Sequence, residues 1–203
     1  MGNTNTKSDL PQRQRLERRI SKNWAPFAHN LSQVLARLEE DQFLILSSKH
    51  GNRFLQFSCQ GAWGMRAEVA SNHFLKGNDR LSRREMAWLR THGWNSPTGT
   101  GGQATPEYDP DGSPNYYIDF PVTVPASDIA KLVIDTLAQG LAVPHPGTLT
   151  YESFDSERGQ LAFEDLGLKP SACRDIPLMD RVLSVFREVT GIEDLAFDKD
   201  GDL

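Results

Sequence analysis

The chain has 203 residues, a net charge of −5 at pH 7 and a hydrophobic share of 38%. A chain of this length can form one domain with an added segment, or two small domains. It is long enough to bury a hydrophobic core without stabilisation by a metal or by disulfides. The acidic balance argues against nucleic-acid binding, and no apolar run approaches the roughly 18 residues of a membrane span. Because no secretory signal stands at the start, we expect a cytoplasmic protein without a membrane partner.

Charge is distributed unevenly along the chain. The first 22 residues carry six Lys/Arg and two acids, whereas residues 148–203 carry thirteen acids and six bases. We therefore predict a flexible basic arm over 1–23, an α+β domain over 24–147 and an acidic C-terminal extension over 148–203 that packs on it. The start, MGNTNT, matches the short N-myristoylation pattern, and we attribute this match to chance.

Apolar periodicity predicts the first elements of the domain. Six apolar residues recur at spacings of three and four in NWAPFAHNLSQVLARLEED and predict a helix: Trp24, Phe27, Leu31, Val34, Leu35 and Leu38. Three strands with turns between them follow, in FLILSS (43–48), RFLQFSCQ (53–60) and GMRAEVAS (64–71). The order predicts an antiparallel meander beside a helix.

The segment LSRREMAWLRTHGW carries four local signals of a helix. Ser82 and Glu85 have the spacing of a capping box, and Leu81 and Met86 stand at the positions of a hydrophobic staple. Gly93 stands where a helix commonly ends on a left-handed residue. The sequence therefore predicts a helix over about 82–93.

The second half adds further elements. A loop rich in Gly, Pro and Thr (95–114) precedes a strand in NYYIDFPV and a helix in VPASDIAKLVIDTLAQGL. GTLTYESFD and GQLAFEDLGL then predict a hairpin, and LMDRVLSVFREVTG predicts a helix whose apolar stripe is Leu178, Val182, Leu183, Phe186 and Val189. The expected fold class is α+β, an antiparallel sheet with helices packed on one face.

Signatures of catalysis and of cofactor binding are incomplete. The loop's GTGG lacks the Lys and the following helix of a phosphate-binding loop, and DPDGS and DKDGD lack the Gly and Glu spacing of a calcium loop. Cys59 lies mid-strand on the same side as the apolar residues Leu55 and Phe57, Cys173 lies in a loop, and the five histidines are scattered. We therefore expect no catalytic residue, no metal site and no cofactor, with an enzyme of an unrecognised class left as an alternative.

In the predicted strands, alternate side chains form a second face of the sheet. The composition of this face is typical of neither a buried core nor a fully solvated surface. The side chains assigned to it are Leu44, Leu46, Phe54, Gln56, Arg66, Glu68, Tyr117 and Asp119. Three interpretations stay open: the extension 148–203 covers this face, a partner docks on it, or it is bare. Aromatic and Arg side chains are enriched where partners bind. The candidate partner-binding residues are Phe54, Gln56, Arg66, Glu68, Tyr117 and Asp119.

Four stretches together resemble a known family: QFSCQGAWGMRAEVASNHFL, LSRREMAWLRTHGW, SPNYYIDFP and DIAKLVIDTL. They are similar to the TY-Chap domains of actinobacterial proteins, which are grouped with type III secretion chaperones and YbjN proteins. The features that match are Arg66–Val69, Asn72, Ser82–Trp94 and Asp128–Leu137, within about residues 24–145. The resemblance implies a chaperone-like α+β fold that binds other polypeptides, with no catalytic residues to carry over.

The expected function is therefore non-enzymatic binding of another polypeptide, as a chaperone or adaptor for a bacterial secreted or conflict-system partner. The alternative is an immunity protein that neutralises a toxin, in which the thirteen acids of 148–203 steer association with a basic effector. A homodimer is left open. The sheet face around Phe54, Arg66 and Tyr117, or the groove beside the Trp24–Leu38 helix, is the expected docking surface.

Overall fold

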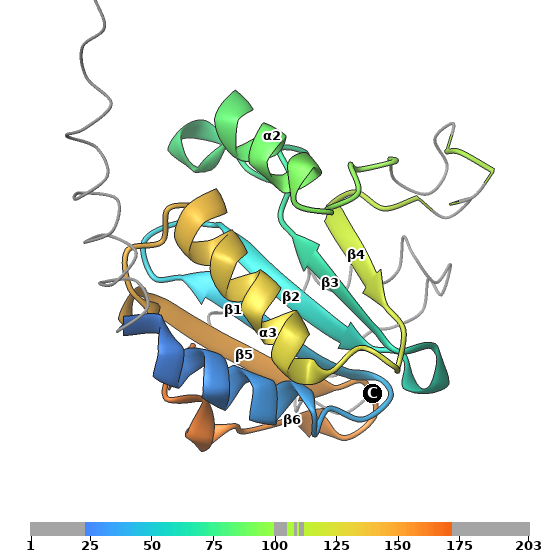
Figure 1. Cartoon of the computed structure of the whole chain (residues 1–203), viewed down its shortest axis with the longest axis vertical. Helices are drawn as coiled ribbons and strands as arrows, with labels where there is room; N and C mark the ends of the chain where they lie inside the picture. Colours follow the sequence, from blue (N-terminus) through green and yellow to red (C-terminus); the bar gives the residue numbers. More distant parts are fainter. Residues whose placement is uncertain (1–22, 100–104, 108, 110–111, 172–203) are drawn as a thin grey trace, which may run out of the picture.

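The computed structural model describes residues 23–99, 105–107, 109 and 112–171 (Figure 1). The basic arm expected at the N-terminus and the helix expected over 178–191 lie outside these ranges. None of the helices in the described ranges is long and apolar enough to cross a membrane.

One mainly antiparallel sheet forms the centre of the molecule. The order of the strands across the sheet is β4-β3-β2-β1-β5-β6, and β7 pairs with β5 in parallel. The strands are β1 (Gln42–Ser48), β2 (Phe54–Cys59), β3 (Met65–Val69), β4 (Tyr116–Phe120), β5 (Leu149–Asp155), β6 (Gly159–Gln160) and β7 (Lys169–Pro170). The meander of β1, β2 and β3 is confirmed.

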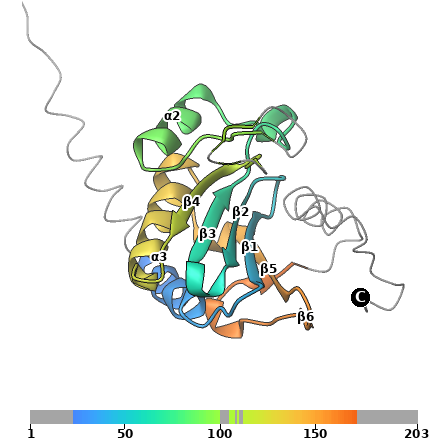
Figure 2. The same cartoon turned by 90° about the vertical axis from the view of Figure 1, so that its right-hand side faces the viewer.

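Two helices cover one face of this sheet. The first helix, residues 23–35, and α3 (Ala126–Asp135) lie on the same side of the strands in both views (Figures 1 and 2). A single π turn, Thr136–Gly140, extends α3, and α2 (Arg83–Thr91) packs against that turn beyond the end of the sheet. The α+β class with helices on one face is therefore confirmed.

Direct strand pairing decides which side chains face the helices. Leu44 pairs with Phe57, and Phe57 pairs with Ala67, so these residues share one face and are buried in the core. The assignment of Leu44 and Leu46 to the other face was wrong, because in the register with β2 these two residues stand opposite core positions. Phe43, Ile45 and Ser47 project to the other side instead.

The predicted helix signals are present in α2. The Ser82 hydroxyl accepts a hydrogen bond from the Glu85 N–H at 3.2 Å, and the Ser82 N–H donates to the Glu85 carboxylate at 2.7 Å. Gly93 has φ = 90°, and the Trp94 N–H returns to the Leu89 carbonyl at 3.1 Å. This left-handed turn directs Trp94 into the core, where its indole N–H donates to Thr136 at 3.1 Å.

The chain after residue 147 continues the sheet. β5 pairs with β1 from Gln42↔Asp155 to Ser48↔Leu149. The predicted second strand over 159–168 is shorter than expected, because the chain leaves β6 and buries Leu166 in the core. The Tyr151 hydroxyl supports this bend by accepting a hydrogen bond from the Phe163 N–H at 3.0 Å. A domain boundary at 147 stays a prediction, although the sheet runs across it.

Candidate functional site

The sheet face that turns away from the first helix and α3 is called here the helix-free face. No helix of the described ranges covers it (Figure 2). The register places all six predicted partner-binding residues on it. Gln56 pairs with Glu68, which pairs with Tyr117, while Arg66 pairs with Asp119 in the next row. Phe54 has the same parity as Gln56. Whether these residues bind a partner stays a prediction.

An ordered ionic cluster occupies the β3–β4 half of the face. The Arg66 guanidinium donates two hydrogen bonds to the Asp119 carboxylate, at 2.6 and 2.9 Å, and a third to the Ser113 hydroxyl at 3.2 Å. It also lies over the Tyr117 ring, 4.7 Å from the ring centroid. A guanidinium held by a carboxylate, a hydroxyl and an aromatic ring has a fixed orientation, so little rotamer freedom is left to lose on binding.

Glu68 is a buried carboxyl group beside that cluster. Burial raises its pKa above the usual range, while the Gln56 amide, the Arg66 charge and Asn115 act in the opposite direction. The Gln56 side chain donates a short hydrogen bond to one carboxylate oxygen. Glu68 therefore holds β2 and β3 together on this face and is closed off from solvent.

The other half of the face, over β1, β2 and β5, mixes apolar and polar side chains. The register places Phe43, Ile45, Phe54 and Phe154 there together with Ser47, Gln56, Ser58, Thr150 and Glu152. The rings of Phe43 and Phe154 stack across the β1–β5 pair with centroids 4.8 Å apart. Ile45, which is 2% exposed, lies in the row between this stack and the row of Phe54. The three phenylalanines are half-buried. Phe43, Phe154, Ile45 and Phe54 form an aromatic strip among these polar side chains, and such a mixture is typical of a contact surface.

Two of the predicted contact residues have a structural role that parity could not show. Tyr117 is 7% exposed and Glu68 is 8% exposed. Asn95 exchanges backbone hydrogen bonds with Tyr117, at 2.8 and 3.2 Å, and so brings the following loop next to this tyrosine. Phe54 also packs partly against the main core. The accessible anchors are Gln56, Arg66 and Asp119, with Phe43 and Phe154 beside them.

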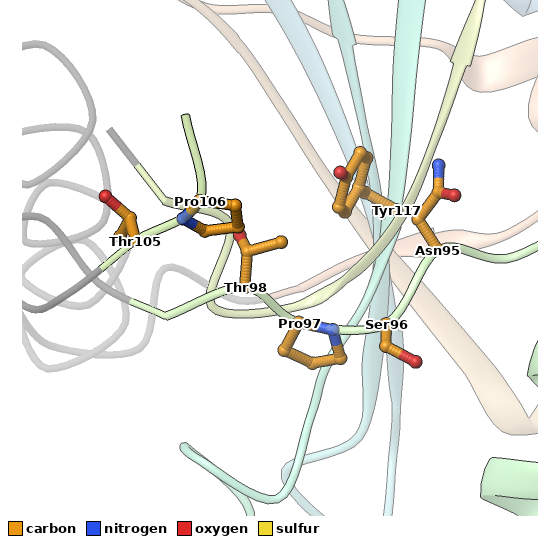
Figure 3. A pocket seen from close by; sticks show the side chains of 7 residues that line it. All are labelled: Asn95, Ser96, Pro97, Thr98, Thr105, Pro106 and Tyr117. Carbon is orange, nitrogen blue, oxygen red and sulfur yellow. The ribbon is translucent and has the colours of Figure 1, made fainter. Parts of the chain in front are cut away.

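A hollow of about 650 Å³ lies next to the cluster, and the Tyr117 ring forms part of its wall (Figure 3). The remaining lining comes from the segment after α2: Asn95, Ser96, Pro97, Thr98, Thr105 and Pro106. Its lining carries hydroxyl and amide groups and no charged side chain. The hollow extends the helix-free face past the edge of β4.

Sequence reasoning missed an exposed aromatic residue at the turn between β2 and β3. Trp63 ends the short 3-10 turn Gly61–Trp63 and is 85% exposed, and Val122, just past β4, is 65% exposed. Gly64 brings these segments together, since a Cβ there would lie 2.0 Å from the Phe120 carbonyl oxygen. A tryptophan between two glycines, in GAWG, was the available signal.

The edges of the sheet are occupied by short segments of the chain itself. Asn95 pairs with Tyr117 beside β4. On the far side of β5, β6 and β7 pair with it, and the Leu161 N–H donates to the Ser153 carbonyl at 2.9 Å. In the described ranges each edge of the sheet thus carries only short pairings of the chain itself, and the helix-free face is the broader surface open to a partner.

The residues considered for catalysis do not come together in the described ranges. No group of three His, Cys, Asp or Glu side chains there has the geometry of a metal site. The Cys59 thiol donates to the Leu38 carbonyl at 3.3 Å and packs against the core, and Cys173 lies outside the described ranges. The His92 ring stacks on Trp88 at 3.7 Å. These contacts are structural.

The apolar side chains of the first helix are buried in the core. Trp24, Leu31 and Val34 are fully buried beneath the sheet, as the periodicity predicted. The exposed residues of this helix are small or polar: Ala25, Pro26, His29 and Gln33. A partner-binding groove beside this helix stays a prediction.

Comparison with known families gives one match. The family model described as "T3SS (YopN, CesT) and YbjN peptide-binding chaperone 3", or TY-Chap3, matches residues 17–155. The matched range ends at the last residue of β5, so it takes in the whole β1–β5 pair and all strands that carry the ionic cluster. Comparisons with curated proteins and with solved structures found no match.

Proposed function

Because the chain belongs to the TY-Chap3 family of peptide-binding chaperones, we propose that it binds a segment of another polypeptide on the helix-free face of its sheet. The family expected from the sequence is confirmed, and the match covers 17–155 where about 24–145 was expected. Binding of a polypeptide is the property that the family description states.

One observation supports this surface above the others. The helix-free face joins an aromatic strip, with Phe43 and Phe154 stacked at 4.8 Å, to an arginine already oriented by Asp119 and Tyr117. Apolar side chains of a partner gain burial on the strip, and its carbonyl or carboxylate groups meet donors on Arg66. Aromatic and Arg anchors of this kind dominate the binding energy of many interfaces.

The class of partner is the second part of the proposal. The chain acts in the bacterial cytoplasm, in an actinobacterial host, as a chaperone or adaptor for a secreted or conflict-system protein, without catalysis. The antidote alternative predicts a basic toxin in the same complex. The identity of a co-purified protein separates the two, because only a toxin is strongly basic and harmful when expressed alone.

A matched pair of arginine substitutions tests the docking surface. Arg66→Ala removes the oriented guanidinium from the helix-free face, and Arg90→Ala removes an exposed arginine from the last turn of α2. Each tagged variant is purified from the native host, and co-purified proteins are quantified by mass spectrometry. We expect Arg66→Ala to weaken retention of the partner by more than about 1 kcal/mol, roughly fivefold, and Arg90→Ala to retain it. Equal retention by both variants would contradict the assignment of the surface.

A further inference from the structure

The described chain ends beside the helix-free face. The Ser171 N–H donates to the Tyr151 carbonyl at 2.7 Å, and the hydroxyls of Ser171 and Thr150 are hydrogen-bonded at 2.9 Å. Thr150 pairs with Ser47, which shares its parity with Ile45 and Phe43. The two hydroxyls therefore meet on the helix-free side of β5, and residues 172–203 follow from there.

The surface next to that point has the size of a short helix. From β5 to β4 the sheet spans four strand spacings, which is about 19 Å at ~4.8 Å each. Across this width the register gives one row of Phe154, Phe43, Ser58, Arg66 and Asp119, and Ile45 and Phe54 lie in the two rows that follow it. No described element covers this strip.

The sequence that follows Ser171 has a matching pattern. Residues 178–189 carry the apolar stripe that the sequence predicts, Leu178, Val182, Leu183, Phe186 and Val189, in which most neighbours are three or four residues apart. Twelve residues of helix measure about 18 Å, and the six residues 172–177 reach up to roughly 20 Å when extended. The segment is thus long enough to lie across the strip.

We propose that the helix-free face is a seat for an amphipathic helix, and that residues 178–189 of this same chain occupy it until a partner helix displaces them. This inference rests on the proposed function, because it names the kind of segment that the face accepts. A tethered segment acts at an effective concentration in the millimolar range, so a partner must compete with it. The apparent affinity for a partner is then reduced by the fraction of chains in which the face is free.

Substitutions within 178–189 of the full-length chain should release this segment and leave the residues of the sheet unchanged. Val182→Glu with Phe186→Glu, the release variant, places two charges on the apolar stripe. Leu195→Glu with Phe197→Glu, the control variant, makes the same change outside 178–189. Binding of a fluorescein-labelled synthetic peptide of residues 174–191 is followed by fluorescence anisotropy. We expect the release variant to bind at least about tenfold more tightly than the wild type and the control variant. Equal binding by all three proteins, or by none, would overturn the proposal.

A cross-link locates the segment directly in the otherwise unchanged chain. p-Benzoylphenylalanine at position 186 should, on irradiation, attach within the same chain to peptides from β1 or β5. Attachment elsewhere, or between two copies, would overturn the proposal. The proposed function and the proposed binding of residues 178–189 to the face can be refuted independently. If position 186 attaches to β1 or β5 and no foreign polypeptide is captured, only the chaperone function fails. If wild type and release variant capture the same partner equally through this face, only the resident segment is refuted.

Discussion

Arg66→Ala should lower the free energy of unfolding by about 1–2 kcal/mol near neutral pH. The substitution removes a two-point ion pair to Asp119 in which the Arg66 side chain is 24% exposed and the Asp119 side chain 50% exposed. A partly exposed pair of this kind contributes roughly 0.2–1 kcal/mol, and the contact with the Tyr117 ring adds about 0.5–1 kcal/mol. Arg66→Lys is the matched control, since it keeps the charge and loses the two-point geometry.

The pH dependence of this loss follows from Glu68. Burial raises the pKa of Glu68 in the folded protein above its ordinary value of 4.5, and the nearby Arg66 charge limits that rise. Between the ordinary value and the raised one, the folded protein holds more protons than the unfolded chain, so stability falls as pH rises through that window. Without the Arg66 charge, the pKa of Glu68 in the folded protein rises further. At pH values above that raised pKa, each additional pKa unit lowers the free energy of unfolding by about 1.4 kcal/mol.

The assay is urea denaturation followed by tryptophan fluorescence, near pH 4.5 and at about pH 8. We expect the deficit of Arg66→Ala relative to wild type to be larger at the higher pH. Arg66→Lys should show a smaller change between the two pH values, because it retains a positive charge beside Glu68. An Arg66→Ala deficit that is the same at both pH values would refute the coupling between Arg66 and the buried carboxyl group.

Three further substitutions test the elements that frame the site. Ser82→Ala removes the acceptor for the Glu85 N–H and should cost about 1 kcal/mol, a fall of roughly 2–4 °C in the thermal midpoint; an unchanged midpoint would contradict the cap. Gly140→Ala should cost about 1–3 kcal/mol in denaturant melts, because a Cβ at this position would lie 2.6 Å from the Trp88 ring; full stability would disprove that close approach. Trp63→Ala should change stability by less than about 0.5 kcal/mol, since the side chain is 85% exposed, and a larger loss would show that Trp63 is packed.

The sequence predicted correctly those local structures that are determined by residues close together along the chain. The Ser82–Glu85 capping box and the left-handed Gly93 depend on residues within about a dozen positions, and both are present. The buried stripe from Trp24 to Leu35 was also found, because a helix repeats its buried positions at fixed spacing, whereas Leu38 is buried after the helix has ended. Such features need no knowledge of what packs against them.

The pairing of strands that are far apart in the sequence could not be predicted in the same way. Strand parity sorts the residues of one strand into two sets, but the partner strand decides which set faces the core. Leu44 and Leu46 were therefore placed on the wrong face, whereas Gln56, Glu68 and Tyr117 were grouped correctly. Tyr117 is buried where it pairs with Asn95, and composition alone suggested only that the loop after Asn95 is irregular.

The helix-free face as a docking surface is tested most directly by cross-linking in the native host. p-Benzoylphenylalanine replaces Phe43, half-buried on this face, or Phe74, half-buried on the turn after β3, in two otherwise identical chains. After irradiation of living cells, covalent adducts with other polypeptides are identified by mass spectrometry. We expect a foreign polypeptide to be attached at position 43 and not at position 74. Adducts formed equally at both positions, or only at position 74, would contradict it.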